Sequence, residues 1–540
     1  MSDNGQANQD NDARPFSGPQ LQNGEFTNAD MTGTNFDGVN LAKARFYAVL
    51  RDAVFDDSDL SSAVFNDVNL AGATFDNVNL KGSKFHNIDL SGTSFDYLNM
   101  RDVEVTRADL TGMTIDGIPV SEFIAAYREK HGISLENDGS SDQENQMFEA
   151  AAHAPLSGKG WSETEAQREI DDIVKDALNN FDETSFWRAH PQDNGTRKGE
   201  TGIYLGATGV IWAMEHLKRT GATTVALDFS PVVERLVDAT QRQFREFEYR
   251  DHGSLHFGDL GALLLAMGLA PEPATADAVF ARASANSELP IRELMWGLPG
   301  SMLACLFMDE MTGESRWQAL FRDQAARLLG ELEETEAGPL WTQDLYETER
   351  RWLGPVHGYA GNMIPLLRGW DWLDEDQRAV VADAVPRTLE ANAILAESGA
   401  QWLPSTDAEP PLRLCQHCHG APGMVSVFAD SPFSTPGLEK LLVAGAELTW
   451  LAGPLAKGSN LCHGTGGNGY AFLKLYRRTG EEKWLERARA FAMTAIEQCR
   501  AARTSYGRGR YSLWTGDPGL ACYLHDCLTA EPRFPTVDVF

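Results

Sequence analysis

Two cysteine–histidine pairs are the residues of this chain best suited to chemistry. Cys418-His419 and Cys462-His463 each stand directly before a glycine, in the strings CHGAPG and CHGTGG. Thiolate sulfur and imidazole nitrogen are ligands that zinc prefers. A single such pair is more often a buried thiol beside a hydrogen-bonded imidazole. Two pairs on equivalent loops instead predict that Cys418, Cys462 and His463 hold one metal ion, with a fourth position left open as in catalytic zinc sites.

Both pairs belong to a pattern that occurs seven times, in which Gly-x-x-Gly leads into an apolar run. The copies spread over 310 residues, about 52 per unit, which leaves room for two helices in each unit. Paired helices repeated seven times predict a closed all-α ring, an (α/α)7 toroid, over residues 161–540. The glycine pairs are Gly206/Gly209, Gly258/Gly261, Gly297/Gly300, Gly358/Gly361, Gly420/Gly423, Gly464/Gly467 and Gly516/Gly519.

The N-terminal part has a different repeat, with one large apolar residue in every five over residues 22–118. A small or apolar residue stands two positions before most of them, as Ala63 does before Phe65. Neither a helix nor a strand has this period. It predicts a four-sided coil of about 20 residues whose interior stacks large and small side chains. The pattern slips once, between Tyr47 and Val54, where we expect a local bulge that does not split the domain.

Composition limits the remaining possibilities. The net charge of -32 over 540 residues argues against nucleic acid or an anionic membrane as the main partner. No apolar run approaches the length of a membrane span, and the first residues do not resemble a signal peptide, so we expect a cytoplasmic protein. Seven cysteines, an odd number, argue against a disulfide framework. We expect a disordered tail at 1–21, and a region at 119–160 that comprises a short helix at 122–130 and a polar linker from about 132 to 160.

Specific strings resemble two known families. The five-residue repeat resembles the pentapeptide-repeat family, which implies a right-handed quadrilateral β-helix. HGYAGN at 357–362, CHGAPG at 418–423, KGSNLCHGTGGNGYAFL at 457–473 and YSLWTGDPG at 511–519 resemble the lanthionine synthetase C-like family. That resemblance implies an α/α toroid with one zinc ion on Cys418, Cys462 and His463. It also makes His357 the candidate acid/base residue.

The same resemblance implies a reaction, the addition of a thiol to dehydroalanine or dehydrobutyrine to form a thioether. The α-carbon must then receive a proton, and His357 is the candidate for handling it because imidazole titrates near neutral pH. Asp259 is a second candidate, for orienting His357 or the attacking group. Lys457 and Arg413 are candidates for attracting an anionic thiol such as glutathione.

The chain differs from the peptide-cyclising members of this family next to the first zinc cysteine, and the difference concerns which thiol is the substrate. His419 follows the first zinc cysteine at a position where peptide-cyclising members commonly have an aromatic residue, so we consider it a possible substrate contact. CHGAPG looks more like the stand-alone and eukaryotic members, which the family associates with glutathione addition to dehydrated proteins. No segment resembles a kinase, lyase or dehydratase, so a dehydrated peptide or protein would have to be made by a separate enzyme.

Other interpretations stay open. Cys415-x-x-Cys418-His419 has the spacing of c-type haem attachment, but that chemistry needs an exported protein. Residues 22–118 carry 15 Asp or Glu against 7 Lys or Arg, and some acidic pentapeptide solenoids occupy type II topoisomerases. The chain could therefore be a non-catalytic binding protein, although a solvated outer face explains the charge equally well. A solenoid that only drives dimerisation is a third possibility.

Overall fold

The computed structural model divides by its internal contacts into two compact units, described separately below. One unit comprises Met1–Asp102 with Asn194–Arg197, and the other comprises Val103–Asp193 with Lys198–Phe540. No helix within the described ranges is long and apolar enough to cross a membrane. The predicted tail at 1–21 and the helix predicted at 122–130 lie outside those ranges. The structure describes residues 35–37, 39–46, 50–81, 83–90, 92–96, 113–115, 118–120, 147–193, 199–246, 253–345, 348–407 and 413–540.

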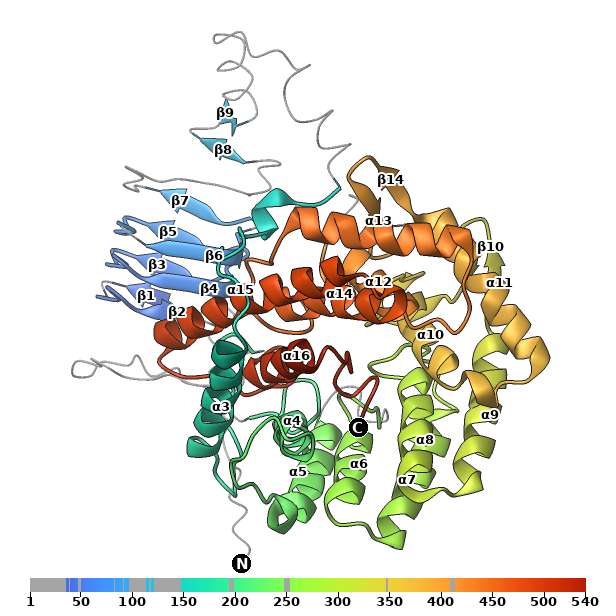
Figure 1. The fold of residues 1–540 in the computed structure, drawn as a ribbon. Coiled ribbons are helices and arrows are strands. Elements are labelled where there is room, and N and C mark those ends of the chain that lie inside the picture. Colours follow the sequence, from blue (N-terminus) through green and yellow to red (C-terminus); the bar gives the residue numbers. More distant parts are fainter. Residues whose placement is uncertain are drawn as a thin grey trace, which may run out of the picture. The chain divides into compact units, whose positions relative to one another are not determined.

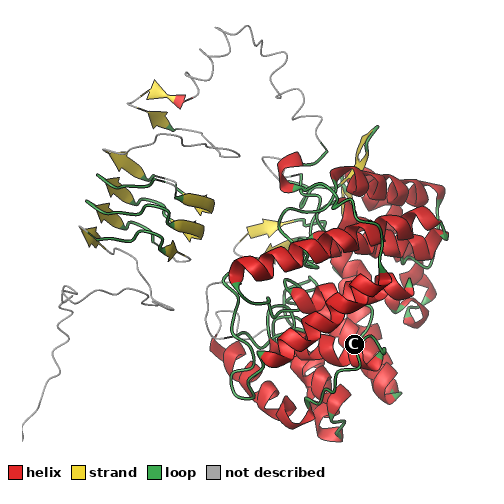
Figure 2. Cartoon of the chain, turned by 60° about the vertical axis from the view of Figure 1, so that its left-hand side comes forward, coloured by secondary structure: helices red, strands yellow, loops and turns green. Residues whose placement is uncertain are grey.

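The first unit contains two parallel sheets in which each strand pairs with one from the next repeat (Figure 2). Val54 pairs with Thr74 and Thr74 with Ser94, a step of 20 residues, whereas Asn35 pairs with Val54 across the slip in the sequence. The interruption therefore does not break the stack. One sheet has β1 (Asn35–Asp37), β3 (Val54–Asp56), β5 (Thr74–Asp76) and β7 (Ser94–Asp96), and the other has β2 (Arg45–Phe46), β4 (Val64–Asn69) and β6 (Lys84–Asp89).

Stacked phenylalanines form the core of this unit. Phe55 stacks on Phe75 with ring centroids 4.8 Å apart, and Phe65 stacks on Phe85 at 4.7 Å. Small residues such as Ala63 are completely buried between them. The large and small residues that the five-residue period places inside the coil are thus buried together, while the right-handed, four-sided path remains a prediction.

The second unit is the predicted ring of paired helices (Figure 1). Each inner helix contacts the next, and α16 contacts α4, so the ring is closed. The inner helices are α4 (Ala207–Arg219), α6 (Leu260–Leu269), α8 (Leu298–Thr312), α10 (Tyr359–Arg368), α12 (Ala421–Phe428), α14 (Thr465–Thr479) and α16 (Asp517–Thr529). The outer helices are α3 (Glu163–Asn179), α5 (Val233–Glu246), α7 (Pro273–Asn286), α9 (Ser315–Gly330), α11 (Glu375–Asn392), α13 (Pro436–Ala452) and α15 (Glu482–Tyr506).

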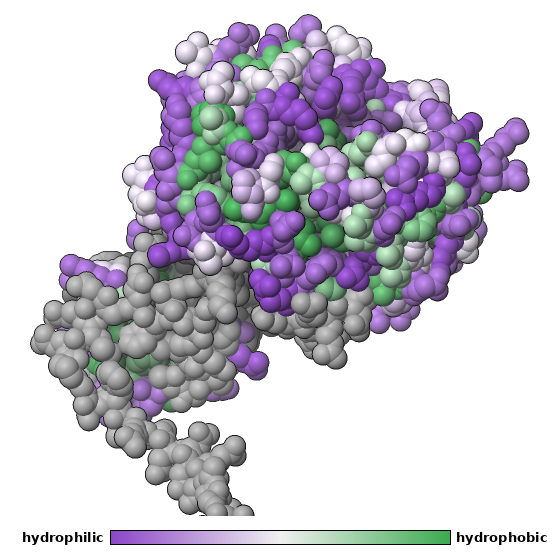
Figure 3. Space-filling model, turned by 90° about the horizontal axis from the view of Figure 1, so that it is seen from below, coloured by the Kyte–Doolittle hydropathy of each residue, from purple (hydrophilic) through white to green (hydrophobic). Residues whose placement is uncertain are grey.

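One face of the ring shows hydrophobic residues in a band between hydrophilic ones (Figure 3).

Short strands and 3-10 helices lie between the α-helices of this unit or precede them. Within the described residues, four antiparallel strand pairs and three short 3-10 helices connect or precede the α-helices. The strand pairs join β8 (Thr114–Ile115) with β9 (Ile118–Pro119), β10 (Glu333–Thr335) with β11 (Gly338–Leu340), β12 (Gln343–Leu345) with β13 (Thr348–Arg350), and β14 (Ile394–Ala396) with β15 (Gly399–Gln401). The 3-10 helices are η1 (Ala150–Ala152), η2 (Ser230–Val232) and η3 (Trp370–Trp372).

The segment predicted as a linker packs, in its described part, against the ring. Met147 is buried in the ring's hydrophobic core, and its carbonyl accepts a hydrogen bond from the Gln401 side chain. The Ala154 amide donates to the Pro454 carbonyl at 2.7 Å. Residues from 147 onward, where the structure describes them, are therefore packed against the ring. The polar composition of 132–160 concealed these backbone contacts.

The repeated glycines have a common steric cause. At the second glycine of every pair, a Cβ atom would lie within 1.8 to 2.7 Å of the carbonyl oxygen six residues earlier, as at Gly467 against Leu461 and Gly300 against Leu294. No real Cβ contact is that short. The loop before each inner helix therefore curls tightly over the helix start, and only glycine fits there.

Candidate metal and catalytic site

The seven glycine loops meet in a closed circle at the start of the inner helices. Because the loop conformation repeats, the residue before the first glycine occupies an equivalent place in each loop. These residues are Leu205, Phe257, Trp296, His357, His419, His463 and Thr515, and the five from Phe257 to His463 are partly exposed. Contacts between successive loops join Tyr204 to His256, His256 to Leu294, Glu293 to His357, His357 to His419, Cys418 to Cys462, Cys462 to Trp514 and Trp514 to Tyr204.

The structure brings the three predicted zinc ligands together. The Cys418 amide donates to the Cys462 carbonyl at 3.0 Å, and the Cys462 sulfur makes side-chain hydrogen bonds with both Cys418 and His463. The hydrogen bond from Cys418 is the largest cause that lowers the pKa of Cys462 well below its usual value, while the pKa of Cys418 is raised. The two cysteine side chains are thus in direct contact and influence each other's pKa.

No group of three or more His, Cys, Asp or Glu side chains among the described residues is arranged around a common ion position. Cys418, Cys462 and His463 instead hydrogen-bond to one another. Two buried sulfurs and one imidazole in contact with one another are nevertheless the donor set that zinc prefers. The chemistry of these residues therefore fits a zinc ion.

His357 lies in the neighbouring loop and is oriented by a carboxylate. Its Nδ1 is 2.9 Å from Oε2 of Glu293, whose side chain is completely buried and also accepts from the backbone amides of Met295 and Trp296. Asp259, the carboxylate considered from the sequence, pairs instead with Arg282 at 2.8 Å. Glu293 is thus the residue placed to fix the orientation of the His357 ring.

The candidate substrate contacts occupy different positions. The ring of His419 lies 6.5 Å from that of His357, and burial is the main cause that lowers its pKa to about 4. Lys457 is exposed and lines a pocket of about 270 Å³ together with Arg508. Its charge acts on both Cys418 and His419. Arg413 is partly buried and does not line this pocket.

Sequence reasoning missed two side chains that touch the sulfurs. The Tyr204 hydroxyl donates to the Cys462 sulfur at 2.8 Å, and Nε2 of Gln416 donates to the Cys418 sulfur at 3.0 Å. Tyr204 stands two residues before the first glycine of its loop, and its aromatic type alone suggests only a core residue. Burial raises the pKa of Tyr204 well above its usual value, so the hydroxyl keeps its proton at neutral pH.

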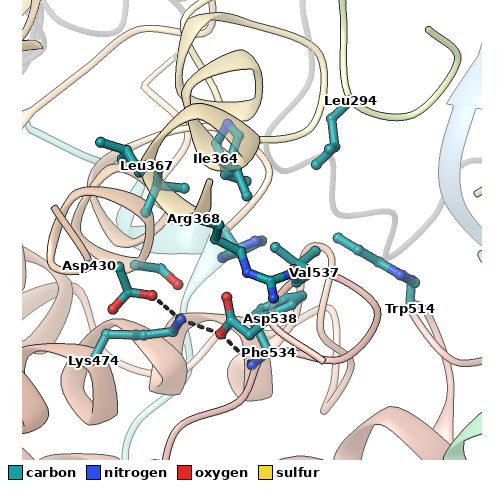
Figure 4. Close-up of a pocket in the computed structure, with 14 residues that line it drawn as sticks. Leu294, Ile364, Leu367, Arg368, Asp430, Lys474, Trp514, Phe534, Val537 and Asp538 are labelled. Atoms are coloured by element: carbon teal, nitrogen blue, oxygen red, sulfur yellow. Dashed lines mark hydrogen bonds and ion pairs between the residues drawn. The ribbon is translucent and has the colours of Figure 1, made fainter. Parts of the chain in front are cut away.

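Beneath the site, the C-terminal segment fills the ring. Phe534 stacks on His417, which adjoins Cys418, with ring centroids 4.4 Å apart. Figure 4 shows Lys474 between the carboxylates of Asp430 and Asp538, with which it forms ion pairs. The cavity left there is only about 30 Å³, room for one or two water molecules. The floor of the site is therefore filled by protein.

Comparison with known protein families covers both units of the chain. A family model described as lanthionine synthetase C-like protein matches residues 161–539, which is more than half of the chain. The chain belongs to the lanthionine synthetase C-like family. A second model, described as pentapeptide repeat region, matches residues 19–119.

Individual relatives share less than a third of their aligned residues with this chain. A protein from Danio rerio named glutathione S-transferase LANCL1 is 28% identical over 46% of this chain and 62% of its own length. The LanC-like protein GCL1 of Arabidopsis thaliana is 30% identical over 46% of this chain and 58% of its own length. The chain thus spans about three fifths of these relatives. The solved structure of nisin cyclase aligns with 68% of this chain and 98% of its own, at 13% identity and a TM-score of 0.47.

Proposed function

We propose that this lanthionine synthetase C-like chain adds a thiol to a dehydroalanine or dehydrobutyrine residue and forms a thioether, with zinc as its cofactor. The observation that carries the proposal is the contact between Cys418, Cys462 and His463 on adjacent loops, beside the His357–Glu293 pair. Neither the cysteine and histidine cluster nor the His357–Glu293 pair indicates this reaction by itself. Together they supply a metal-ligand set and a general acid within one circle of loops.

The cysteines and the histidine of the cluster have a different role from His357 in the proposed reaction. Cys418, Cys462 and His463 would hold the zinc ion, which lowers the pKa of a bound thiol when it is present. In the reaction, the substrate sulfur forms a bond to the β-carbon, the electrons of the double bond move toward the α-carbon, and a proton adds there. The thiol loses one proton and the α-carbon gains one, so no further reactant is needed.

His357 is the residue we assign to protonating the α-carbon. Its Nδ1 faces Glu293, and we assign Nε2 to the proton exchange with substrate. The buried carboxylate of Glu293 holds the ring in one orientation. General acid catalysis by a positioned histidine typically contributes about 10²- to 10⁴-fold.

The pocket beside Lys457 favours an anionic small thiol as one substrate. Lys457 and Arg508 bring positive charge to it in a chain whose net charge is -32. Arg503 and Arg510 also line it, but they pair with Asp517 and Asp193. Glutathione carries two carboxylates, and a curated relative is named a glutathione S-transferase. We therefore propose glutathione as the thiol, with a dehydrated peptide or protein from a separate enzyme as its partner.

We propose that the pentapeptide-repeat unit binds the dehydrated peptide or protein substrate. Its strands follow one another in a 20-residue register, which suits the right-handed quadrilateral coil that its family implies. A cytoplasmic location, where glutathione is abundant and thiols stay reduced, suits the seven free cysteines.

The experiment combines metal analysis with mass spectrometry of a dehydroalanine peptide, incubated with the protein with and without glutathione. We expect one zinc per wild-type chain, and a peptide heavier by one glutathione. Unchanged mass with lost thiol reactivity would instead indicate cyclisation of a cysteine-containing peptide.

Cys462→Ala should lose both zinc and activity. Cys305→Ala is the matched control, because Cys305 is a fully buried thiol on α8 that hydrogen-bonds to Gln324. The control should keep zinc and activity. Metal-free wild-type protein that still forms the adduct at the full rate would contradict the proposal.

A further inference from the structure

Each of the two site cysteines receives a hydrogen bond from a side chain outside the predicted ligand set. The donors are the Tyr204 hydroxyl, 2.8 Å from the Cys462 sulfur, and the Gln416 amide, 3.0 Å from the Cys418 sulfur. Gln416 lies two residues before Cys418 on the same loop, whereas Tyr204 comes from a loop 258 residues away. A contact between such distant loops depends on the closed ring.

Backbone and ring contacts fix the place of Tyr204. Its amide donates to His256 at 3.1 Å, and its carbonyl accepts from Trp514 at 3.2 Å. The Trp514 carbonyl in turn accepts from the Cys462 amide at 2.9 Å. The Tyr204 ring also packs on Phe257, with centroids 4.9 Å apart. One residue, Trp514, thus sets the backbone positions of both Tyr204 and Cys462, so their side chains meet in a defined geometry.

We propose that Tyr204 is a positioning residue for the metal centre, and that its hydroxyl orients the Cys462 sulfur as a ligand and withdraws charge from it. The inference rests on the proposed function, because it requires zinc on Cys462. Gln416 has the same role toward Cys418. Tyr204 does not contact the ion or the substrate in this assignment.

The physical reason is the charge of a thiolate ligand. Two thiolates and one neutral imidazole give a zinc site no net charge, and electron-rich sulfur weakens the ion's pull on a third, incoming sulfur. A hydrogen bond to each thiolate reduces that donation and also restricts the side chain to one rotamer. Hydrogen bonds to charged groups are stronger than those between neutral groups, so the effect of Tyr204 should be measurable.

The test compares Tyr204→Phe with wild type in the full chain. The change removes one oxygen atom and leaves the ring in place. Removal of partners that hydrogen-bond to metal ligands typically weakens metal binding by about 10- to 100-fold. We expect a loss of that size in competition with a zinc chelator, because the loss of a fixed orientation for the Cys462 side chain outweighs the stronger electron donation of its sulfur. In cobalt-substituted protein, the sulfur-to-cobalt charge-transfer band should shift to longer wavelength, because the Cys462 sulfur becomes more electron-rich.

Tyr523→Phe is the matched control. Tyr523 is completely buried, and its hydroxyl donates to the Ala488 carbonyl at 2.7 Å. This variant should lose a comparable amount of thermal stability but keep the zinc affinity and the cobalt spectrum of wild type. A merely structural role for Tyr204 would make the two variants alike.

The outcomes separate the two proposals. Wild-type protein that binds no zinc would overturn both the proposed function and this inference. Zinc in wild type, together with unchanged affinity and an unchanged cobalt spectrum in Tyr204→Phe, would overturn this inference alone. Should Tyr204→Phe fold poorly, Gln416→Leu provides the parallel test at Cys418, with the same expected direction in both measurements.

Discussion

Glu293→Gln isolates what the carboxylate does for His357. Glu293 is completely buried and makes three hydrogen bonds, to His357 Nδ1 and to the amides of Met295 and Trp296. Glutamine keeps the size of the side chain but replaces one acceptor oxygen with an NH₂ donor. If its oxygen faces His357, the NH₂ faces the Trp296 amide. If the NH₂ group faces His357, it opposes the Met295 amide, which is also a donor. His357 Nδ1 would then have to accept the hydrogen bond from the NH₂ group.

The structure sets the size of the effect. A hydrogen bond to a charged group contributes about 1.5–3 kcal/mol, and Glu293→Gln removes the carboxylate that makes this bond with a protonated His357 ring. At about 1.4 kcal/mol for each factor of ten, kcat should fall by roughly 10- to 150-fold. The substrate KM should change little, because Glu293 acts through His357 and does not line the pocket beside Lys457.

The assay is the rate of glutathione adduct formation on a dehydroalanine peptide, with zinc content measured in parallel. Glu169→Gln is the control, since Glu169 is a buried carboxylate on α3 that pairs with Arg500. Both variants should lose stability, and both should keep zinc. Wild-type kcat in Glu293→Gln would refute the assignment of His357 as a general acid oriented by Glu293.

Two further predictions concern charge. Lys457→Met should raise the KM for glutathione by about two- to five-fold, the range for an exposed ion pair, with little change for an uncharged thiol or at high salt. Lys440→Met is the control, and an equal rise for both thiols would contradict the electrostatic role. Burial raises the pKa of Asp526 to about 8 from 3.8, so the folded chain keeps a proton that the unfolded chain releases above about pH 4. Stability should therefore fall as pH rises from about 4 to about 8, and Asp526→Asn should flatten that slope in urea unfolding at pH 5 and pH 8. A slope equal to that of wild type would refute this origin.

The ring and its cysteines could be predicted because they repeat. A glycine under the carbonyl six residues before it tolerates no other residue, so the pattern stays visible in the sequence and marks each inner helix. Cys418 and Cys462 occupy equivalent loops, and their register alone placed them side by side. The stack of strands was predictable for the same reason, since Phe65 and Phe85 are one repeat apart.

Contacts made by only one loop could not be predicted in this way. Glu293 lies four residues before Gly297, in a string where a charged residue suggests solvent, yet the neighbouring loop covers it completely. Tyr204 meets Cys462 only because the ring closes, and nothing local to either residue signals the contact. The segment that begins at Met147 contacts the ring through hydrogen bonds of its backbone groups, and such bonds leave no mark in composition.

In each glycine loop, the position that fixes the backbone conformation differs from the position that varies in side-chain type, and protein engineers can use this separation. The second glycine of each pair is fixed by sterics, but the residue before the first glycine ranges from leucine to tryptophan, histidine and threonine without altering the curl. Five of those positions are partly exposed, and two of the five, His357 and His463, belong to the proposed site. A combinatorial library restricted to Phe257, Trp296 and His419 should therefore alter substrate contacts while leaving the loops folded.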